Sequence, residues 1–320
     1  MPSAGPGPVP IGMHPAGWGD PKPHPVFRHP RSIMKESLTG HVLEPIIRKA
    51  LAEDIGPGDL TTSSILSGEE RGEGRALAKS DLVLAGIDVF ITAFRLLDPT
   101  AALREALVDG TAVRPGQTVA VVSGSLCALL SAERTALNFL QRMSGIATMT
   151  RQFVDAVKGT GTRILDTRKT VPGLRVLDKY AVRAGGGTNH RFALYDGVLI
   201  KENHVAAAGG IGSAVQRVRR RAPHTVRVEV EVRNLEELRE ALDAGADMVM
   251  LDNMDVEAMR EAVLRAGGRI PLEASGNVSL ANVRTIAGTG VDFISVGSLT
   301  HSVRAADISL LISPEPPPEG

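Results

Sequence analysis

Short apolar runs and helical patterns alternate along the second half of the chain. The runs predict strands at residues 163–166, 197–201, 226–231, 247–251, 270–274 and 291–296, with helices between them. The later strands recur about every 20 residues, which is the spacing of strand-helix units in a parallel sheet rather than of hairpins in an antiparallel one. The pattern therefore predicts an α/β fold in which six strands form a parallel barrel.

The first half has a mixed pattern that predicts a separate α+β domain. An amphipathic helix begins near Val42 and ends at the Gly56-Pro57-Gly58 turn. Short strand patterns and turns, with one helix among them, fill residues 71–126. A long helix begins at Ser131, with apolar residues at helical spacing. These elements would pack in front of the barrel.

These two patterns set the expected domain boundaries. The N-terminal α+β domain covers residues 32–143 and the barrel covers 144–302. A last strand pattern within 303–313 could return to the first domain. The two ends of the chain, 1–31 and 314–320, are rich in proline and have no periodic apolar pattern, so we predict disordered tails.

Composition narrows the class of protein. Acidic and basic residues balance at 36 each, so no global charge points to nucleic acid or to a membrane surface. Cys127 is the only cysteine, which excludes an intrachain disulfide, and its apolar surroundings favour a core position over a nucleophile. No apolar stretch reaches the roughly 18 residues of a membrane helix, and no leader pattern opens the chain. We expect a cytoplasmic enzyme.

Five basic side chains follow two of the predicted strands or lie between them. Arg168 and Lys169 come after the first strand, Lys201 ends the second, and His190 and Arg191 follow three consecutive glycines between the strands. Parallel barrels place such strand ends together at one mouth. Clustered cations are costly without an anion, so the pattern predicts a small ligand with more than one negative charge. The alternative is a solvated basic loop.

Two carboxylates end the next pair of strands. The segment 226–232 alternates strictly, so its valines would face the outer helices while Glu229 and Glu231 point inward. Glu231, the later of the two, would reach the mouth, and Asp252 ends the following strand. Their hard oxygen atoms suit a ribose diol and its Mg²⁺. The alternative is that both acids merely neutralise the cations opposite.

Small residues close the last two strands. Each turn is expected to lead directly into a helix, whose N-terminus favours a phosphate. The phosphate site of parallel barrels usually lies in these last loops, although either turn alone is a weak signal. The two turns consist of Ser275, Gly276 and Asn277, and of Val296, Gly297 and Ser298.

Three motifs in this order carry a family resemblance. The segments DTRKT at 166–170, NHR at 189–191 and IKENH at 200–204 resemble those of quinolinate phosphoribosyltransferase, the decarboxylating nicotinate-nucleotide pyrophosphorylase of NAD synthesis. The resemblance extends from about Glu53 to Ser302. It implies an incomplete α/β barrel and a reaction of quinolinate with phosphoribosyl pyrophosphate that gives nicotinate mononucleotide, pyrophosphate and CO₂.

The resemblance also implies roles for single residues. It places the dicarboxylate against Arg168, His190, Arg191 and Lys201, with Lys169 and Thr170 beside them. It places the ribose and Mg²⁺ at Glu231 and Asp252, and the phosphates at the two small-residue turns. Arg134 matches an arginine that a neighbouring subunit contributes, which implies a homodimer with shared sites. Lys169 is the candidate proton donor after decarboxylation, and Asn277 stands where some relatives carry another residue.

Two other functions stay open. One is a related phosphoribosyltransferase-like barrel of molybdenum transport loci, which would use a different acceptor. The complete set of cations for a dicarboxylate argues against it. The other is a non-catalytic phosphate-binding barrel that serves as a sensor or scaffold. The two carboxylates argue against that function, because a sensor has no transition state to stabilise.

Overall fold

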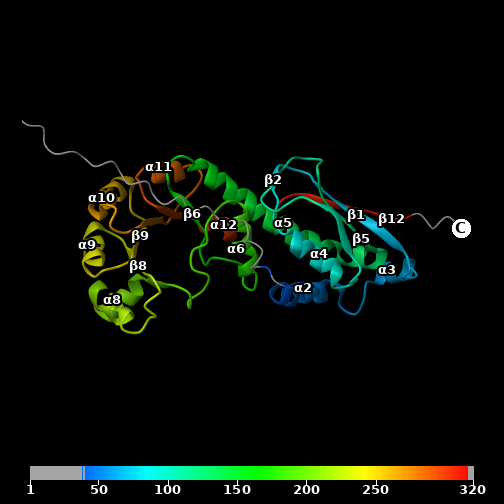
Figure 1. The fold of residues 1–320 in the computed structure, drawn as a ribbon, viewed down its shortest axis with the longest axis horizontal. Helices are drawn as coiled ribbons and strands as arrows, with labels where there is room; N and C mark the ends of the chain where they lie inside the picture. Colours follow the sequence, from blue (N-terminus) through cyan, green and yellow to red (C-terminus); the bar gives the residue numbers. More distant parts are fainter. Residues whose placement is uncertain (1–37, 39, 316–320) are drawn as a thin grey trace, which may run out of the picture.

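The computed structural model describes residue 38 and residues 40–315, so the tail predicted over 1–31 and residues 316–320 lie outside the described part. Two halves lie side by side along the long axis of the molecule, with one long helix running between them (Figure 1). The first half and this helix comprise α2 (Gly40–Ile55), α3 (Leu60–Ile65), β1 (Arg71–Ala78), β2 (Leu82–Val83), α4 (Ile87–Arg95), β3 (Ala102–Ala106), β4 (Ala112–Val113), β5 (Thr118–Ser125) and α5 (Leu126–Ala156).

An antiparallel sheet forms the frame of the first half. Its order is β12-β1-β5-β3, so the last strand of the chain, β12 (Ile308–Pro314), lies beside β1 as the sequence predicted for this segment. Helix α4 buries one apolar face, with Phe90 and Phe94 fully enclosed and their rings in an edge-to-face arrangement. A small second sheet pairs β2 with β4.

Helix α5 joins the two halves. Its 31 residues begin at Leu126, five positions before the predicted start, and continue past the boundary that we expected between residues 143 and 144. Cys127 therefore lies in the first turn of a helix and is half-buried rather than fully enclosed in the core. The domain boundary itself stays a prediction, because a continuous helix marks no division at that point.

The second half is a six-stranded parallel sheet with helices on its outer side. The sheet order is β6-β11-β10-β9-β8-β7, and no pairing joins β6 to β7 among the described residues. The barrel is therefore incomplete, as the family resemblance implied. Its elements are β6 (Arg163–Leu165), α6 (Arg175–Ala184), β7 (Val198–Ile200), α7 (Glu202–Ala208), α8 (Ile211–Arg219), β8 (Val228–Val232), α9 (Leu235–Asp243), β9 (Met248–Asp252), α10 (Val256–Ala266), β10 (Leu272–Ser275), α11 (Val283–Ala287), β11 (Phe293–Ser295) and α12 (Ser298–His301).

Strand β8 confirms the predicted alternation. Val228, Val230 and Val232 are completely buried against the outer layer, while Glu229 and Glu231 project from the opposite face into the barrel. The same strand therefore delivers two carboxylates at different depths, and both take part in the site. Among residues 38 and 40–315, no helix combines the length and apolar character that a membrane crossing requires.

Candidate active site

The C-terminal ends of the parallel strands carry the predicted site residues. Because β6 to β11 run in one direction, the segments that follow them meet at one edge of the sheet. Arg168, Lys169 and Thr170 follow β6, Lys201 follows β7, Glu231 lies near the end of β8, and Asp252 ends β9. Ser275 ends β10 and is followed by Gly276 and Asn277, and Val296 to Ser298 follow β11. The structure thus gathers the predicted barrel residues at one mouth.

Asp166, directly after β6, anchors the segment that carries His190 and Arg191. Its completely buried carboxylate forms an ion pair with Lys179 of α6 and accepts a hydrogen bond from the side-chain amide of Asn189. It also accepts the backbone N–H of His190 at 2.9 Å, while Lys179 Nζ donates to the His190 carbonyl at 3.1 Å. One buried charge pair therefore fixes this segment from both sides.

Glycine is required where this segment passes close to α5. A Cβ atom on Gly185 would lie 2.5 Å from the Ala147 carbonyl oxygen, and one on Gly187 would lie 2.8 Å from the side chain of Thr150. Both distances are too short for any larger residue. The glycine run is thus a packing device that lets the loop follow the long helix, rather than a phosphate cradle.

A second buried carboxylate, Asp178, positions the loop with Arg168 and Lys169. Arg142 of α5 binds it through two nitrogen atoms, at 3.0 and 2.8 Å. Asp178 also accepts the backbone N–H of Val171 at 3.1 Å. The Lys169 carbonyl accepts a hydrogen bond from the Thr300 hydroxyl at 2.8 Å. The loop is held by groups from α5, α6 and α12 together.

The basic side chains of the mouth have few protein partners. Arg168, Lys169 and Arg191 have no carboxylate within 4.0 Å among the described residues. The Nε of Arg168 is buried without a hydrogen-bond partner in the described part of the chain. Burial and the neighbouring charge of Arg168 lower the pKa of Arg191. These cations repel one another, and a bound anion would offset that repulsion.

The two acids of the mouth have different surroundings. Glu231 forms an ion pair with Lys201 at 2.5 Å, so part of the neutralisation that we held as an alternative does occur. Asp252 has no ion pair in the described part of the chain and accepts a hydrogen bond from the Asn253 amide at 3.1 Å. Two carboxylates alone are too few for a protein-built Mg²⁺ site but fit a Mg²⁺ that substrate oxygen atoms and water also bind.

The turn after β10 has the predicted small residues in an unusual backbone conformation. Asn253 and Asn277 have φ angles of 54° and 50°, in the left-handed region that asparagine tolerates better than most residues. The Asn277 amide donates to Asn253 Oδ1 at 3.0 Å, which ties this turn to the one after β9. The expected helix does not follow directly, because α11 begins only at Val283. That part of the phosphate prediction is wrong.

The turn after β11 does lead into a helix, but α12 has only four residues. The Val296 amide donates to the Leu165 carbonyl at 3.0 Å and extends the sheet. A Cβ atom on Gly297 would lie 3.1 Å from Lys169 Cδ and from His301 Nε2, so the small residue admits the lysine stem beside the turn. Lys169 is thus placed next to this predicted phosphate turn.

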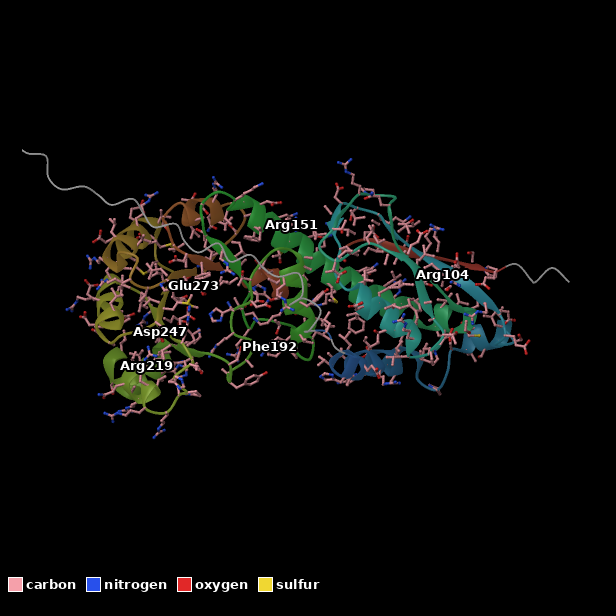
Figure 2. The ribbon with its side chains drawn as sticks, in the orientation of Figure 1. Arg104, Arg151, Phe192, Arg219, Asp247 and Glu273 are labelled. Carbon is pink, nitrogen blue, oxygen red and sulfur yellow. The ribbon has the colours of Figure 1, made fainter. Side chains whose placement is uncertain are left out.

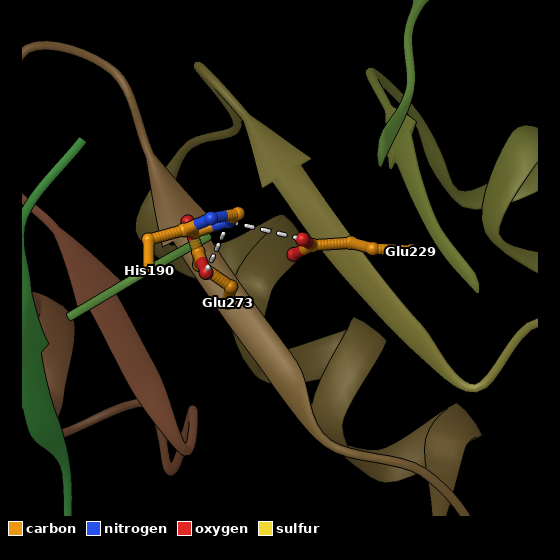
Figure 3. A group of neighbouring side chains, drawn as sticks. All are labelled: His190, Glu229 and Glu273. Carbon is orange, nitrogen blue, oxygen red and sulfur yellow. Dashed lines mark hydrogen bonds and ion pairs between the residues drawn. The ribbon is translucent and has the colours of Figure 1, made fainter. Parts of the chain in front are cut away.

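Beneath the mouth lies a cluster of three side chains, His190, Glu229 and Glu273 (Figure 3). His190 Nε2 lies 3.0 Å from Glu229 Oε2 and 3.6 Å from Glu273 Oε2, and Nδ1 accepts the backbone N–H of Arg191 at 2.7 Å. Glu273 is completely buried inside the barrel half (Figure 2). Burial, and next the charge of Glu229, raise the pKa of Glu273 to about 8.

Four residues of this region had no assigned role in the sequence interpretation: Asp166, Lys179, Glu229 and Glu273. Alternation along β8 did predict that Glu229 points inward. Glu273 was merely the residue before a turn, and a buried carboxylate in an apolar strand was the available signal. Lys179 lies in an amphipathic helix, and its sequence position alone does not indicate burial. In each case the partner is far away in sequence.

Arg134 is the one predicted site residue outside the barrel. It is exposed on α5 and makes no hydrogen bond or ion pair within the described residues. Neighbouring side chains on the same helical turns face the N-terminal half: Ser131 donates to Asp59 at 2.9 Å and Thr135 to Asp54 at 3.5 Å. Among the described residues of one chain, no hydrogen bond or ion pair links Arg134 to the mouth.

Comparison with known families decides the identity of the chain. The model of the quinolinate phosphoribosyl transferase C-terminal domain matches residues 146–311, and that of the N-terminal domain matches residues 59–144. The chain belongs to the quinolinate phosphoribosyltransferase family. A relative from Bacillus subtilis (strain 168), a probable nicotinate-nucleotide pyrophosphorylase, is 47% identical over 268 residues, which cover 84% of this chain and 92% of the relative.

Other members of the quinolinate phosphoribosyltransferase family agree in sequence and in structure. The chloroplastic nicotinate-nucleotide pyrophosphorylase of Arabidopsis thaliana is 44% identical over 85% of this chain and 83% of its own length. NadC from Streptococcus pyogenes superposes with a TM-score of 0.84 at 39% identity, covering 87% of this chain and 99% of that one. The Francisella tularensis nicotinate-nucleotide pyrophosphorylase gives 0.83 at 40% identity, covering 86% and 98%.

Proposed function

We propose that this chain transfers a phosphoribosyl group to quinolinate, giving nicotinate mononucleotide, pyrophosphate and CO₂ in de novo NAD biosynthesis. The observation that carries the proposal is the set of three cations at the mouth, Arg168, Lys169 and Arg191, none with a carboxylate within 4.0 Å among the described residues. A planar dicarboxylate would supply the missing negative charge. The same substrate is supported by the names of close relatives, among them a quinolinate phosphoribosyltransferase of Nicotiana tabacum.

The basic residues would hold the dicarboxylate. Arg168 and Arg191 would bind it through their guanidinium groups, and Lys201 would bind once Glu231 turns toward the sugar. His190 lies in the same turn as Arg191, and Thr170 lies beside the loop, where Arg175 Nε donates to its hydroxyl at 3.0 Å. Arg134 of the partner subunit would complete the site in a homodimer.

The acids would act on the sugar. The ring nitrogen of quinolinate displaces pyrophosphate at the ribose C1, and positive charge develops on the sugar as the bond to pyrophosphate breaks. Glu231 and Asp252 would hold the ribose hydroxyls and favour that charge. Mg²⁺, held by these two carboxylates directly or through water, would neutralise charge on the leaving pyrophosphate when bound. The turns at 275–277 and 296–298 would hold the phosphates.

Decarboxylation needs orientation more than a strong base. Once the ring nitrogen carries the ribose, the ring accepts the electron pair that the departing carboxylate leaves behind. A proton must then reach the ring carbon. Lys169, whose stem lies against Gly297, is the candidate donor because it is exposed at the mouth and has no carboxylate partner in the described part of the chain.

An activity assay tests the function. Purified protein with quinolinate, phosphoribosyl pyrophosphate and Mg²⁺ should release one CO₂ for each nicotinate mononucleotide formed. Arg168→Ala is the matched inactive control, because it removes one unpaired cation and no structural partner. Binding of phosphoribosyl pyrophosphate without turnover would favour the non-catalytic barrel. Turnover with another acceptor and no CO₂ would favour the related barrel of molybdenum transport loci. The cytoplasmic location stays a prediction.

A further inference from the structure

The cluster of His190, Glu229 and Glu273 has an uneven set of hydrogen bonds (Figure 3). Glu229 Oε2 faces His190 Nε2 at 3.0 Å, whereas Glu273 Oε2 lies 3.6 Å from the same nitrogen, beyond hydrogen-bond range. Both oxygen atoms of Glu273 and the second oxygen of Glu229 are buried without a hydrogen-bond partner among the described residues. Two buried carboxylates thus share the imidazole donor, and the Ser295 hydroxyl lies beside Glu273.

The backbone of Arg191 decides the protonation of the imidazole. Its N–H donates to His190 Nδ1 at 2.7 Å, so Nδ1 must carry a lone pair and no hydrogen. The single hydrogen of the ring is then on Nε2, which donates to Glu229. Burial lowers the pKa of His190, but the hydrogen bond with Glu229 and the charges of both glutamates outweigh it and raise the pKa. The Arg191 hydrogen bond nevertheless requires a bare Nδ1, so the imidazole is neutral in this arrangement, with both nitrogen atoms engaged inside the protein.

A neutral imidazole leaves two adjacent carboxylates inside the barrel. Glu273 on β10 is faced by Glu229 from β8, Asp166 from the end of β6, Ser295 from β11 and His190 from the glycine-rich segment. The two glutamates cannot both be ionised at low cost, so the cluster needs one more proton. That proton can be on Glu273 or on His190 Nδ1, with the same net charge, and the Arg191 N–H excludes Nδ1.

We propose that Glu273 is a positioning residue that keeps this proton as a neutral carboxylic acid. His190 then stays neutral, and its Nδ1 fixes the Arg191 backbone so that the guanidinium faces the dicarboxylate. The role of Arg191 rests on the proposed function, whereas the location of the proton does not. The complete burial of Glu273 and its pKa of about 8 agree with a neutral acid at physiological pH.

A divalent cation is the competing occupant. The three possible ligand atoms lie within 4.8 Å of one another, a spacing that could hold a metal ion. A cation would need the Nε2 lone pair and hence a hydrogen on Nδ1, which would point at the Arg191 N–H. The hydrogen bond from Arg191 therefore favours the proton over the metal.

Histidine NMR on the unmodified chain tests the proton directly. With ¹⁵N-labelled histidine, and His190→Asn to assign the signal, His190 should have a bare Nδ1 and a protonated Nε2 at about pH 7. A doubly protonated His190 would place the proton on the ring and overturn the proposal. So would a stoichiometric divalent metal in the purified protein that Glu273→Gln removes. Neither measurement requires turnover.

Two glutamine variants then separate the roles of the two acids. Glu273→Gln imitates the neutral acid, so the KM for quinolinate should stay within about threefold of wild type. Glu229→Gln makes the same chemical change but removes the charged acceptor, so that KM should rise roughly tenfold. The KM for phosphoribosyl pyrophosphate should change in neither. A larger rise in Glu273→Gln than in Glu229→Gln would overturn the assignment.

The pH profile supplies a readout that a purely structural role would not move. Above about pH 8, Glu273 in wild type should lose its proton to solvent and leave two adjacent buried carboxylates beside neutral His190. Their repulsion should displace the imidazole, weaken the Arg191 hydrogen bond and raise the KM for quinolinate. Glu273→Gln has no such proton to lose, so its KM should stay level over the same range. A rise of equal size in both proteins would contradict the proposal.

Discussion

Two layers of charge meet at the C-terminal ends of the barrel strands, and the protein satisfies only one of them. In the lower layer, Asp166 pairs with Lys179, Asp178 with Arg142, and Glu229 with His190, all mostly out of solvent. In the upper layer, Arg168, Lys169 and Arg191 have no carboxylate within 4.0 Å in the described part of the chain. The pairs of the lower layer form within the protein itself, whereas the upper layer is complementary to a ligand.

This difference separates stability from function. A buried ion pair that loses one partner leaves a charge without compensation, which costs several kcal/mol. A cation that repels its neighbours in the free protein costs little to remove, because its favourable contacts form only with the ligand. Substitutions in the lower layer should therefore affect folding, and substitutions in the upper layer should affect binding and turnover.

The largest effect is expected from Asp166→Asn. It leaves Lys179 buried without a counter-charge and places an amide where Asn189 and His190 donate, so the free energy of unfolding should fall by about 3–5 kcal/mol in urea titrations. Asp255→Ala removes the carboxylate that accepts the Ala258 N–H at the start of α10. It should lower the free energy of unfolding by about 1 kcal/mol. Arg168→Ala should cost less still. Equal losses in Asp166→Asn and Arg168→Ala would erase the distinction between the layers.

The pH dependence of stability should reveal the proton on Glu273. Its pKa is about 8 in the folded state and ordinarily 4.5, so the folded state keeps a proton that the unfolded state loses. This group therefore favours folding fully below about pH 4.5, and its contribution is lost as the pH rises toward 8. As the pH rises across that window, the free energy of unfolding of Glu273→Gln should increase relative to that of wild type by on the order of a few kcal/mol in urea titrations. If the free energies of unfolding of the two proteins changed in parallel with pH, the pKa of Glu273 would be ordinary.

Substrate preference tests the upper layer. Quinolinate has two carboxylates and nicotinate has one, so nicotinate should leave a cation uncompensated at a cost of about 3–5 kcal/mol, or on the order of a hundredfold or more in kcat/KM. Arg191→Ala should reduce this preference, because it removes one of the cations that the second carboxylate satisfies. Comparable turnover of both acids by wild type would contradict the assignment.

Among all the predicted residues of the mouth, acids and cations should separate by kinetic parameter. Asp252→Asn should lower kcat roughly tenfold or more while calorimetry finds quinolinate binding nearly unchanged, since Asp252 is assigned to the sugar and Mg²⁺. Glu231→Gln should do the same but also release Lys201, its ion-pair partner. Arg191→Ala and Lys201→Ala should weaken quinolinate binding itself. Loss of quinolinate affinity in Asp252→Asn would move that residue to the dicarboxylate.

The smallest signal is expected from mixed dimers. Arg134→Ala and Lys169→Ala should each be nearly inactive alone, but about half of the reassembled dimers would be hybrids with one intact site, so roughly a quarter of wild-type activity should return. Mass spectrometry would confirm the hybrids. No recovery in confirmed hybrids would assign Arg134 to its own chain's site or to no site. The partner subunit would then contribute no cation to the mouth.

Most strands were predictable from the sequence because their apolar runs are local. All six barrel strands lie within the predicted ranges or one residue beyond them. Strands β3 and β4 have no such apolar run, since β3 is largely exposed and has no alternation of apolar and polar residues, and β4 has only two residues. Helix α5 was predicted to start late because β5 passes into it at Ser125 without a turn residue to mark the change.

The two layers also differ in how far the sequence could predict them. The upper layer follows strand ends directly, so its residues could be predicted from position along each strand. The lower layer depends on pairs that are remote in sequence, such as His190 with Glu229 and Lys179 with Asp166. A carboxylate in a sequence does not indicate its partner, so the contact of Glu273 with His190 could not be predicted.

The pairing of β12 with β1 has a consequence for synthesis of the chain. The sheet of the N-terminal half needs a strand that the ribosome makes only after the barrel, because Ile308–Pro314 lies beside Arg71–Ala78. Until then, one edge of β1 has free backbone donors and acceptors, and the whole barrel must be made in between. The first half of this enzyme therefore cannot be finished before the second, and a nascent chain stalled before residue 308 would present an open sheet edge.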